Sequence, residues 1–192
     1  MRKHSNAEHP ELQVTGSSGH SPSGWGQLFP SKRWISSLVI GLSFTSITVG
    51  FTVINPQNTL WLSDGDRAQR YLGWEFYRSS DWGFPLFSNP RYGMELGTSV
   101  AYTDSIPLLA APFKALLMFS SSPFQYFGIW VVTCLVLQAY FGQVLISRFT
   151  QSVLLQIAGS SLFVMAPAMV YRVGVGQESL VAHFLLLAAY SV

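Results

Sequence analysis

Residues 124–147 decide the fold; they read FQYFGIWVVTCLVLQAYFGQVLIS and contain no charged side chain. About 20 apolar residues are enough for a helix to cross the hydrocarbon core of a bilayer. Residues 34–54 and 152–171 are runs of the same kind, and residues 178–192 begin another that is too short to cross. A half-crossing helix would leave backbone carbonyls unsatisfied in lipid. The sequence therefore predicts an all-α integral membrane protein with four spans, the last incomplete, in a chain that is a fragment of a longer protein.

The composition agrees with a lipid environment. Hydrophobic residues make up 49% of the chain and charged residues only 10%, whereas soluble domains carry about 25% charged residues. The net charge of +2 comes without a basic tract, so we expect no nucleic-acid partner. The single cysteine, Cys134, lies in the central apolar run and cannot form an internal disulfide, which favours a plain packing role.

The charges that flank the apolar runs predict how the chain lies in the membrane. Residues 1–31 are polar and rich in Ser, Gly, His and Pro, so we expect a disordered tail. Lys32 and Arg33 should keep this tail in the cytoplasm, which makes the first span a retained signal anchor rather than a cleaved signal peptide. With Arg148 also inside, the short apolar segment 106–119 lies along the outer interface instead of crossing.

The long loop at residues 55–122 is then external and holds most of the ionisable side chains. A connector between two helices needs only a few residues. We therefore expect a folded layer on the outer leaflet, with membrane lipid as its partner and its Trp and Tyr rings at the headgroup level. Its first helix should begin at Ser63 or Asp64 and end near Ser79. Residues 32–192 together would form one transmembrane domain.

The acidic residues of this loop have two interpretations. Asp64 and Asp66 either cap the first helix and pair with Arg70 on its surface, or one of them is a general base or metal ligand beside the membrane. Asp104 either caps the interfacial helix, a role that Ser105 could also fill, or binds a ligand. Spacing alone leaves both interpretations open.

The first helix of the loop has two chemically distinct faces. Ala68, Leu72 and Phe76 are spaced four apart and form an apolar stripe, because residues one turn apart share a face. A different face carries most of the cations of the segment, namely Arg67, Arg70 and Arg78, together with Trp74.

Four motifs carry a resemblance to a known class of membrane proteins. A signal anchor followed by Asp-Gly-Asp at residues 64–66 and by acid-x-x-Pro at residues 104–107 resembles the first module of the GT-C superfamily of glycosyltransferases. More narrowly, the chain resembles a bacterial family of uncharacterised GT-C-like membrane proteins over residues 55–190. The matching motifs are GDRAQRYLGWEFYR at 65–78, NPRYGMELG at 89–97, TDSIPL at 103–108 and FQYFG at 124–128.

The resemblance implies a GT-C-like multi-helix bundle in the bacterial inner membrane and a transferase that takes a sugar from a polyprenyl-phosphate donor on the outer face. The acceptor would belong to the cell envelope. Asp66, with Asp64 as the alternative, would be the general base. The residues implied to bind the substrate are Arg67, Arg70, Arg78, Asp104, Arg172 and His183. The resemblance names no metal ligand and leaves a divalent cation open. The resemblance also implies Gly-His near the start of the last helix, where this chain has Gly176-Gln177.

A competing interpretation is a non-catalytic membrane protein, such as a lipid-carrier transporter or an assembly subunit. The sequence contains no phosphate-cradling glycine loop, nucleophile elbow or pair of metal ligands. Under either interpretation we expect this chain to be inactive alone, because later helices would complete the site.

Overall fold

The computed structural model describes residues 30–191. The tail expected to be disordered lies outside the described residues except for its last positions. The α-helices are α1 (Pro30–Thr48), α2 (Gly65–Ser79), α3 (Pro107–Leu116), α4 (Phe127–Ile146), α5 (Val153–Val164), α6 (Pro167–Gly174) and α7 (Phe184–Ser191). The short elements are the 3-10 helices η1 (Phe51–Ile54), η2 (Leu60–Leu62) and η3 (Glu178–Leu180), and the strands β1 (Ser88–Asn89) and β2 (Thr98–Ser99).

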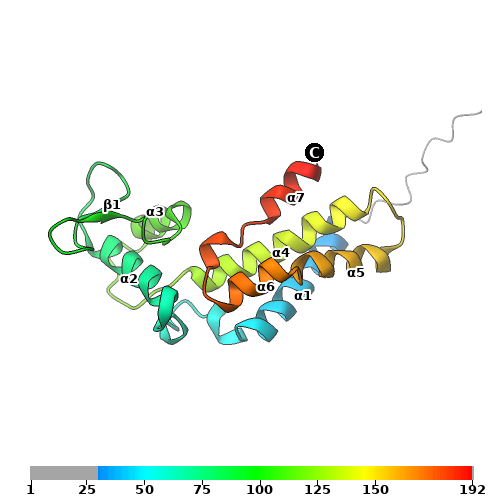
Figure 1. The fold of residues 1–192 in the computed structure, drawn as a ribbon, viewed down its shortest axis with the longest axis horizontal. Helices are drawn as coiled ribbons and strands as arrows, with labels where there is room; N and C mark the ends of the chain where they lie inside the picture. Colours follow the sequence, from blue (N-terminus) through cyan, green and yellow to red (C-terminus); the bar gives the residue numbers. More distant parts are fainter. Residues whose placement is uncertain (1–29, 192) are drawn as a thin grey trace, which may run out of the picture.

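The chain divides into a helix bundle and a cap. In the bundle, α4 packs against α1, α5 and α7. The cap comprises residues 51–126 and includes α2, α3 and the antiparallel pair β1–β2, in which Ser88 lies opposite Ser99. Figure 1 shows the cap at the end of the bundle where α4 begins.

The prediction of an all-α protein with four spans, a GT-C-like bundle, is wrong. Among the described residues, α4 is the one helix that is long and apolar enough to span a membrane. The helices α5 and α6 meet that criterion only when taken together as one bent span, so the total is one or two. The cap also contains a small sheet, where the sequence predicted helices and turns alone.

Apart from residues 124–147, which contain α4, each expected span falls short for an identifiable reason. Residues 34–54 overlap α1, but Lys32, Arg33 and many serines and threonines make this helix too polar. Residues 152–171 are interrupted at Pro167, where α5 gives way to α6 with a bend of 47°, because proline has no N–H to continue the helical bonds. Residues 178–192 divide into η3 and the eight-residue α7.

The helix α2 ends at Ser79, as the sequence predicts, but it buries its polar face. Arg70, Trp74 and Tyr77 are buried, whereas Leu72 and Phe76 from the apolar stripe are exposed. Hydrophobicity alone would favour the opposite orientation. The partners of Arg70 and Trp74 in the rest of the fold therefore set the rotation of this helix.

The expected side-chain caps do not form. Asp64 occupies the N-cap position of α2 without a capping hydrogen bond from its side chain. The N-cap of α3 is Ile106, with a left-handed φ of 50°, so neither Asp104 nor Ser105 takes that place. The Ser105 hydroxyl instead donates to the backbone oxygen of Arg70 at 2.7 Å, which fastens the start of α3 to α2.

Aromatic side chains join the cap to α4. The Trp74 ring is fully buried and packs edge-on against Tyr126, with 5.0 Å between ring centroids. Its indole N–H donates to the backbone oxygen of Phe124 at 2.9 Å. Phe113 from α3 stacks on Tyr126 at 5.4 Å. Rings from α2, α3 and the residues just before α4 thus form one core, which holds the cap on the end of the bundle.

Close backbone contact fixes the start of α4. The buried Gln125 side chain donates to the backbone oxygens of Val53 and Asn55 at 2.8 and 3.0 Å. Gly128 packs so closely that a Cβ there would lie 1.8 Å from the Val53 oxygen. A glycine is therefore required where η1 crosses α4.

We predict that Gly128→Ala destabilises the protein by about 1–3 kcal/mol, because the added methyl group must displace the backbone of Val53. Thermal unfolding followed by circular dichroism measures the change. Gly174→Ala is the matched control, since a Cβ at Gly174 would meet nothing within 4 Å. We expect it to change stability by less than about 1 kcal/mol. Equal effects of the two substitutions would contradict the close packing.

Candidate functional site

The most concentrated group of charges lies where the cap meets α6 and η3. The Arg67 guanidinium binds the Glu178 carboxylate at 2.7 Å, and Arg70 binds the other carboxylate oxygen. Glu178 is fully buried and Arg70 nearly so. We call Arg67, Arg70, Arg172, Glu178 and His183 the junction cluster. Two of its cations therefore share one carboxylate.

Backbone groups complete the surroundings of this ion pair. Arg67 also donates to the backbone oxygen of Val173 at 2.7 Å. The indole N–H of Trp130 in α4 donates to the Glu178 backbone oxygen at 2.8 Å. Gly176 has a left-handed φ of 83°, and a Cβ there would lie 2.9 Å from the Arg67 side chain. The cluster thus ties together α2, α4 and the segment between α6 and α7.

Arg172 and His183 form the outer part of the junction cluster. Arg172 donates to the Leu180 backbone oxygen at 2.8 Å and contacts Nε2 of His183 at 2.6 Å. Because a guanidinium can only donate, Nε2 must accept, which places the imidazole proton on Nδ1. Burial, with the positive charge of Arg172, lowers the pKa of His183 below its ordinary value. The ring is therefore neutral at pH 7.

Several buried hydrogen-bond donors of this region have no partner among the described residues. They are Nε of Arg70, the indole N–H of Trp61 and the hydroxyl of Ser179. Trp61 belongs to the region because its ring lies 5.6 Å from the Arg67 guanidinium carbon. Unsatisfied buried donors are costly. The junction therefore has a surplus of donors and of positive charge.

The acidic residues proposed from the sequence lie at two separate places on the cap. Asp64 and Asp66 are exposed at the first turn of α2, next to Arg67 in the chain. Asp104 is exposed just before α3, with a left-handed φ of 54°. The expected Asp66–Arg70 pair is not formed, since Arg70 turns inward to Glu178. Asp66 is thus an exposed carboxylate in the residue directly before Arg67 of the junction cluster.

Arg78 lies apart from the other arginines, at the opposite end of α2. Twelve residues separate it from Asp66, which corresponds to about 18 Å along a helix. Its guanidinium donates to the backbone oxygens of Ser120 and Ser122 at 2.8 and 2.7 Å and pairs with Glu75 at 3.4 Å. Arg78 therefore cannot act on the same reacting atoms as Asp66.

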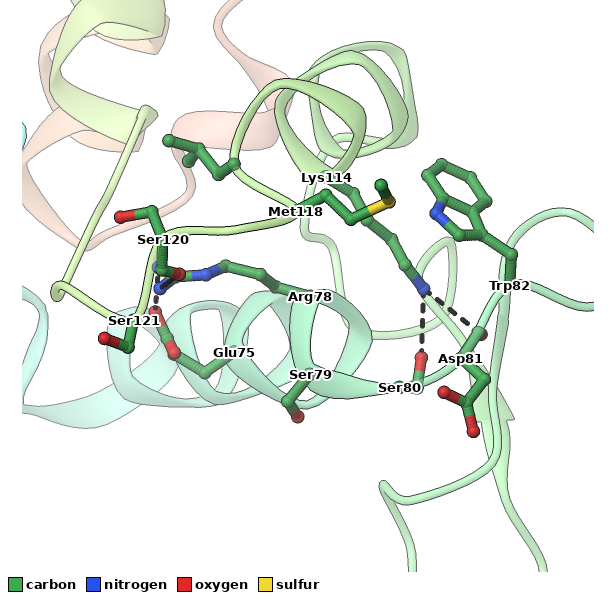
Figure 2. A pocket seen from close by; sticks show the side chains of 11 residues that line it. Glu75, Arg78, Ser79, Ser80, Asp81, Trp82, Lys114, Met118, Ser120 and Ser121 are labelled. Atoms are coloured by element: carbon green, nitrogen blue, oxygen red, sulfur yellow. Dashed lines mark hydrogen bonds and ion pairs between the residues drawn. The ribbon is translucent and has the colours of Figure 1, made fainter.

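A pocket of about 490 Å³ opens beside Arg78. Figure 2 shows the Lys114 side chain reaching from α3 toward residues 80–82, with the Trp82 ring above its ammonium group. The lining residues are Glu75, Arg78, Ser79, Ser80, Asp81, Trp82, Lys114, Leu117, Met118, Ser120 and Ser121. Its size is within the usual range of ligand sites, about 300–1,000 Å³.

Sequence reasoning missed Glu178, Lys114 and Trp82 as site residues. Glu178 carried a usable signal, because it is the only acidic residue after Asp104 and begins the apolar run 178–192. A lone carboxylate in such a run needs a charged partner. Lys114 had no comparable signal, since only folding brings α3 against the end of α2.

Residues 30–191 contain no group of three His, Cys, Asp or Glu side chains placed to hold a metal ion. The protein is thus a helical bundle with a helix long and apolar enough to span a membrane and with a polar cap over one end. The chain belongs to the family described as a domain of unknown function, DUF6311, whose model matches residues 38–192. No curated protein and no solved structure matches the chain.

We predict that Glu178→Gln destabilises the protein by about 3–5 kcal/mol, because it leaves two guanidinium groups without their carboxylate. Chemical unfolding measures the change. The control is Glu95→Gln, at an exposed position, for which we expect a change within about 0.5 kcal/mol. A loss for Glu178→Gln no larger than that of the control would show that the ion pair does not stabilise the fold.

We also predict a pH dependence that arises from His183. Its folded-state pKa lies below the ordinary value of 6.5, so the unfolded chain binds this proton more readily. Stability is then fully present above about pH 6.5 and decreases as the pH falls through the folded-state pKa. His183→Gln should reduce the difference in unfolding temperature between pH 7.5 and pH 5. An unchanged difference would contradict this assignment.

Proposed function

We propose that the protein is part of a membrane glycosyltransferase, which moves a sugar from a polyprenyl-phosphate donor to an envelope acceptor. The cap would lie on the outer face of the bacterial inner membrane, with the N-terminus in the cytoplasm. The observation that carries the proposal is the junction cluster: cations and unpaired donors gather near the start of α2, where the exposed Asp66 directly precedes Arg67 in the chain.

The charge balance of the junction supports binding of a lipid phosphate. The cluster holds three arginines and a single carboxylate: Arg67 and Arg70 bind Glu178, whereas Arg172 contacts His183. Guanidinium groups suit phosphate oxygens because their donors form a planar fork. Arg67 and Arg172 keep partly exposed side chains, so they are the members that would contact the phosphate.

The proposed reaction uses Asp66 as general base, with Asp64 as the alternative. The acceptor hydroxyl oxygen attacks the anomeric carbon of the sugar, and the hydroxyl proton passes to the Asp66 carboxylate. The bond between the anomeric carbon and the phosphate oxygen breaks, and its electron pair leaves with the lipid phosphate. The cations of the junction stabilise the charge that develops on this leaving group.

The alternative is a non-catalytic membrane protein that holds a lipid phosphate without transferring its sugar. The same cluster supports this function, since binding of the phosphate requires the arginines but no carboxylate. The two proposals differ in the role of Asp66, and this residue therefore provides the test.

We predict that Asp66→Asn in the full-length protein lowers kcat for sugar transfer from a polyprenyl-phosphate sugar at least about 100-fold. KM for the donor should change little, because the arginines remain. Membranes from cells that produce each variant are supplied with donor carrying a radiolabelled sugar, and the label in envelope material is counted.

Asp64→Asn discriminates between the two acids, and Glu95→Gln serves as the control at an exposed site. A large loss in Asp64→Asn alone would move the base to Asp64. Unchanged transfer in both aspartate variants would remove them from the mechanism. Binding of the lipid phosphate without transfer by the unmodified protein would favour the non-catalytic alternative.

A further inference from the structure

The pocket beside Arg78 has its own walls and chemistry, separate from the junction cluster. It lies at the carboxyl end of α2 and is closed by residues 79–82 and by the chain that leaves α3. The length of α2 separates it from Asp66 by about 18 Å. A function of this pocket therefore does not depend on the function proposed for the junction.

Lys114 holds one wall of the pocket in place. Its ammonium group donates to the Ser80 hydroxyl at 3.1 Å and to the Asp81 backbone oxygen at 3.3 Å. The rings of Tyr77 and Trp82 lie 4.1 and 4.7 Å from the same nitrogen. A cation over aromatic rings is attracted by their negative faces. Lys114 is thus occupied by the protein and fixes the orientation of Trp82.

The charges of the pocket cancel. Its cations are Lys114 and Arg78, and its anions are Glu75 and Asp81. Arg78 is also engaged, because it donates to two backbone oxygens and pairs with Glu75. A charged ligand of either sign would therefore meet as many like charges as opposite ones. The lining therefore favours a ligand without net charge.

The groups that remain available to a ligand are polar acceptors and donors beside an exposed indole. The Glu75 side chain is 32% exposed, and its contact with Arg78 is long, at 3.4 Å. Its carboxylate can therefore accept further hydrogen bonds from a ligand. Ser120 and Ser121 are exposed residues of the pocket lining, and each carries a hydroxyl group. Trp82 is 44% exposed and, with Met118, supplies apolar surface. A polyhydroxylated ring has hydroxyls at its edge and C–H groups on its faces, which matches this lining.

We propose that this pocket binds a neutral saccharide, with Glu75, Ser120 and Ser121 hydrogen-bonded to its hydroxyls and Trp82 packed against its C–H face. The site is a binding site without a catalytic role, and its ligand class follows from the balanced charges and from the exposed indole.

Saturation-transfer NMR of the intact protein, in a detergent without a sugar headgroup, tests the proposal. The probes are methyl glycosides of neutral hexoses, with glucuronate and glucosamine as charged counterparts. We expect at least one neutral glycoside to bind more tightly than either charged sugar. Its affinity should fall at least about tenfold in Trp82→Ala and in Glu75→Gln.

Two matched controls accompany these variants. Phe84→Ala removes an aromatic ring that is 98% exposed near Trp82, and Glu95→Gln removes a distant carboxylate. Both should bind the glycoside as the unmodified protein does. Because Trp82→Ala also alters the surroundings of Lys114, Glu75→Gln with an unchanged unfolding temperature is the decisive variant. Binding of no neutral glycoside, stronger binding of a charged sugar, or full affinity in Glu75→Gln would each overturn the proposal.

Discussion

The carboxylate of Glu178, buried between the guanidinium groups of Arg67 and Arg70, is the contact on which the arrangement of cap and bundle depends. A buried charge is tolerated only when it is paired and hydrogen-bonded. Once the segment before α7 carries this carboxylate, α2 must turn its arginine face inward. This requirement explains why Leu72 and Phe76 are exposed. It also explains why the chain breaks between η3 and α7, where a continuous apolar helix was expected.

The helix α2 thereby presents different chemistry at its two ends. Its first turns carry the exposed Asp66 and the arginines that join the junction cluster, and a group of cations suits a lipid phosphate. Its last turn faces α3 and forms a pocket whose charges are balanced, which suits a neutral ligand. The aromatic core around Trp74 and Tyr126 holds both ends in a fixed relation to α4.

Local sequence patterns predicted the positions of helices better than they predicted the contacts that those helices make. The end of α2 at Ser79 and the central apolar helix α4 follow from helix periodicity and from a long uncharged run. The predicted number of membrane spans was wrong because the length of an apolar run does not by itself reveal the helix break at Pro167 or the polarity of α1. The caps expected from Asp64 and Asp104 did not form, since such residues also serve in turns.

The sequence by itself determined that the chain is rich in helix, that residues 124–147 form a run able to span a membrane, and that the charges are concentrated in a long polar segment. These properties are local, because they depend on composition and on spacing within a few turns. Only the tertiary structure decided that Glu178 pairs with Arg67 and Arg70 across more than one hundred residues, and that Lys114 meets Trp82. Such contacts depend on which faces pack together, and the free-energy cost of leaving the buried Glu178 carboxylate unpaired outweighs the preference of a single helix to bury its apolar stripe.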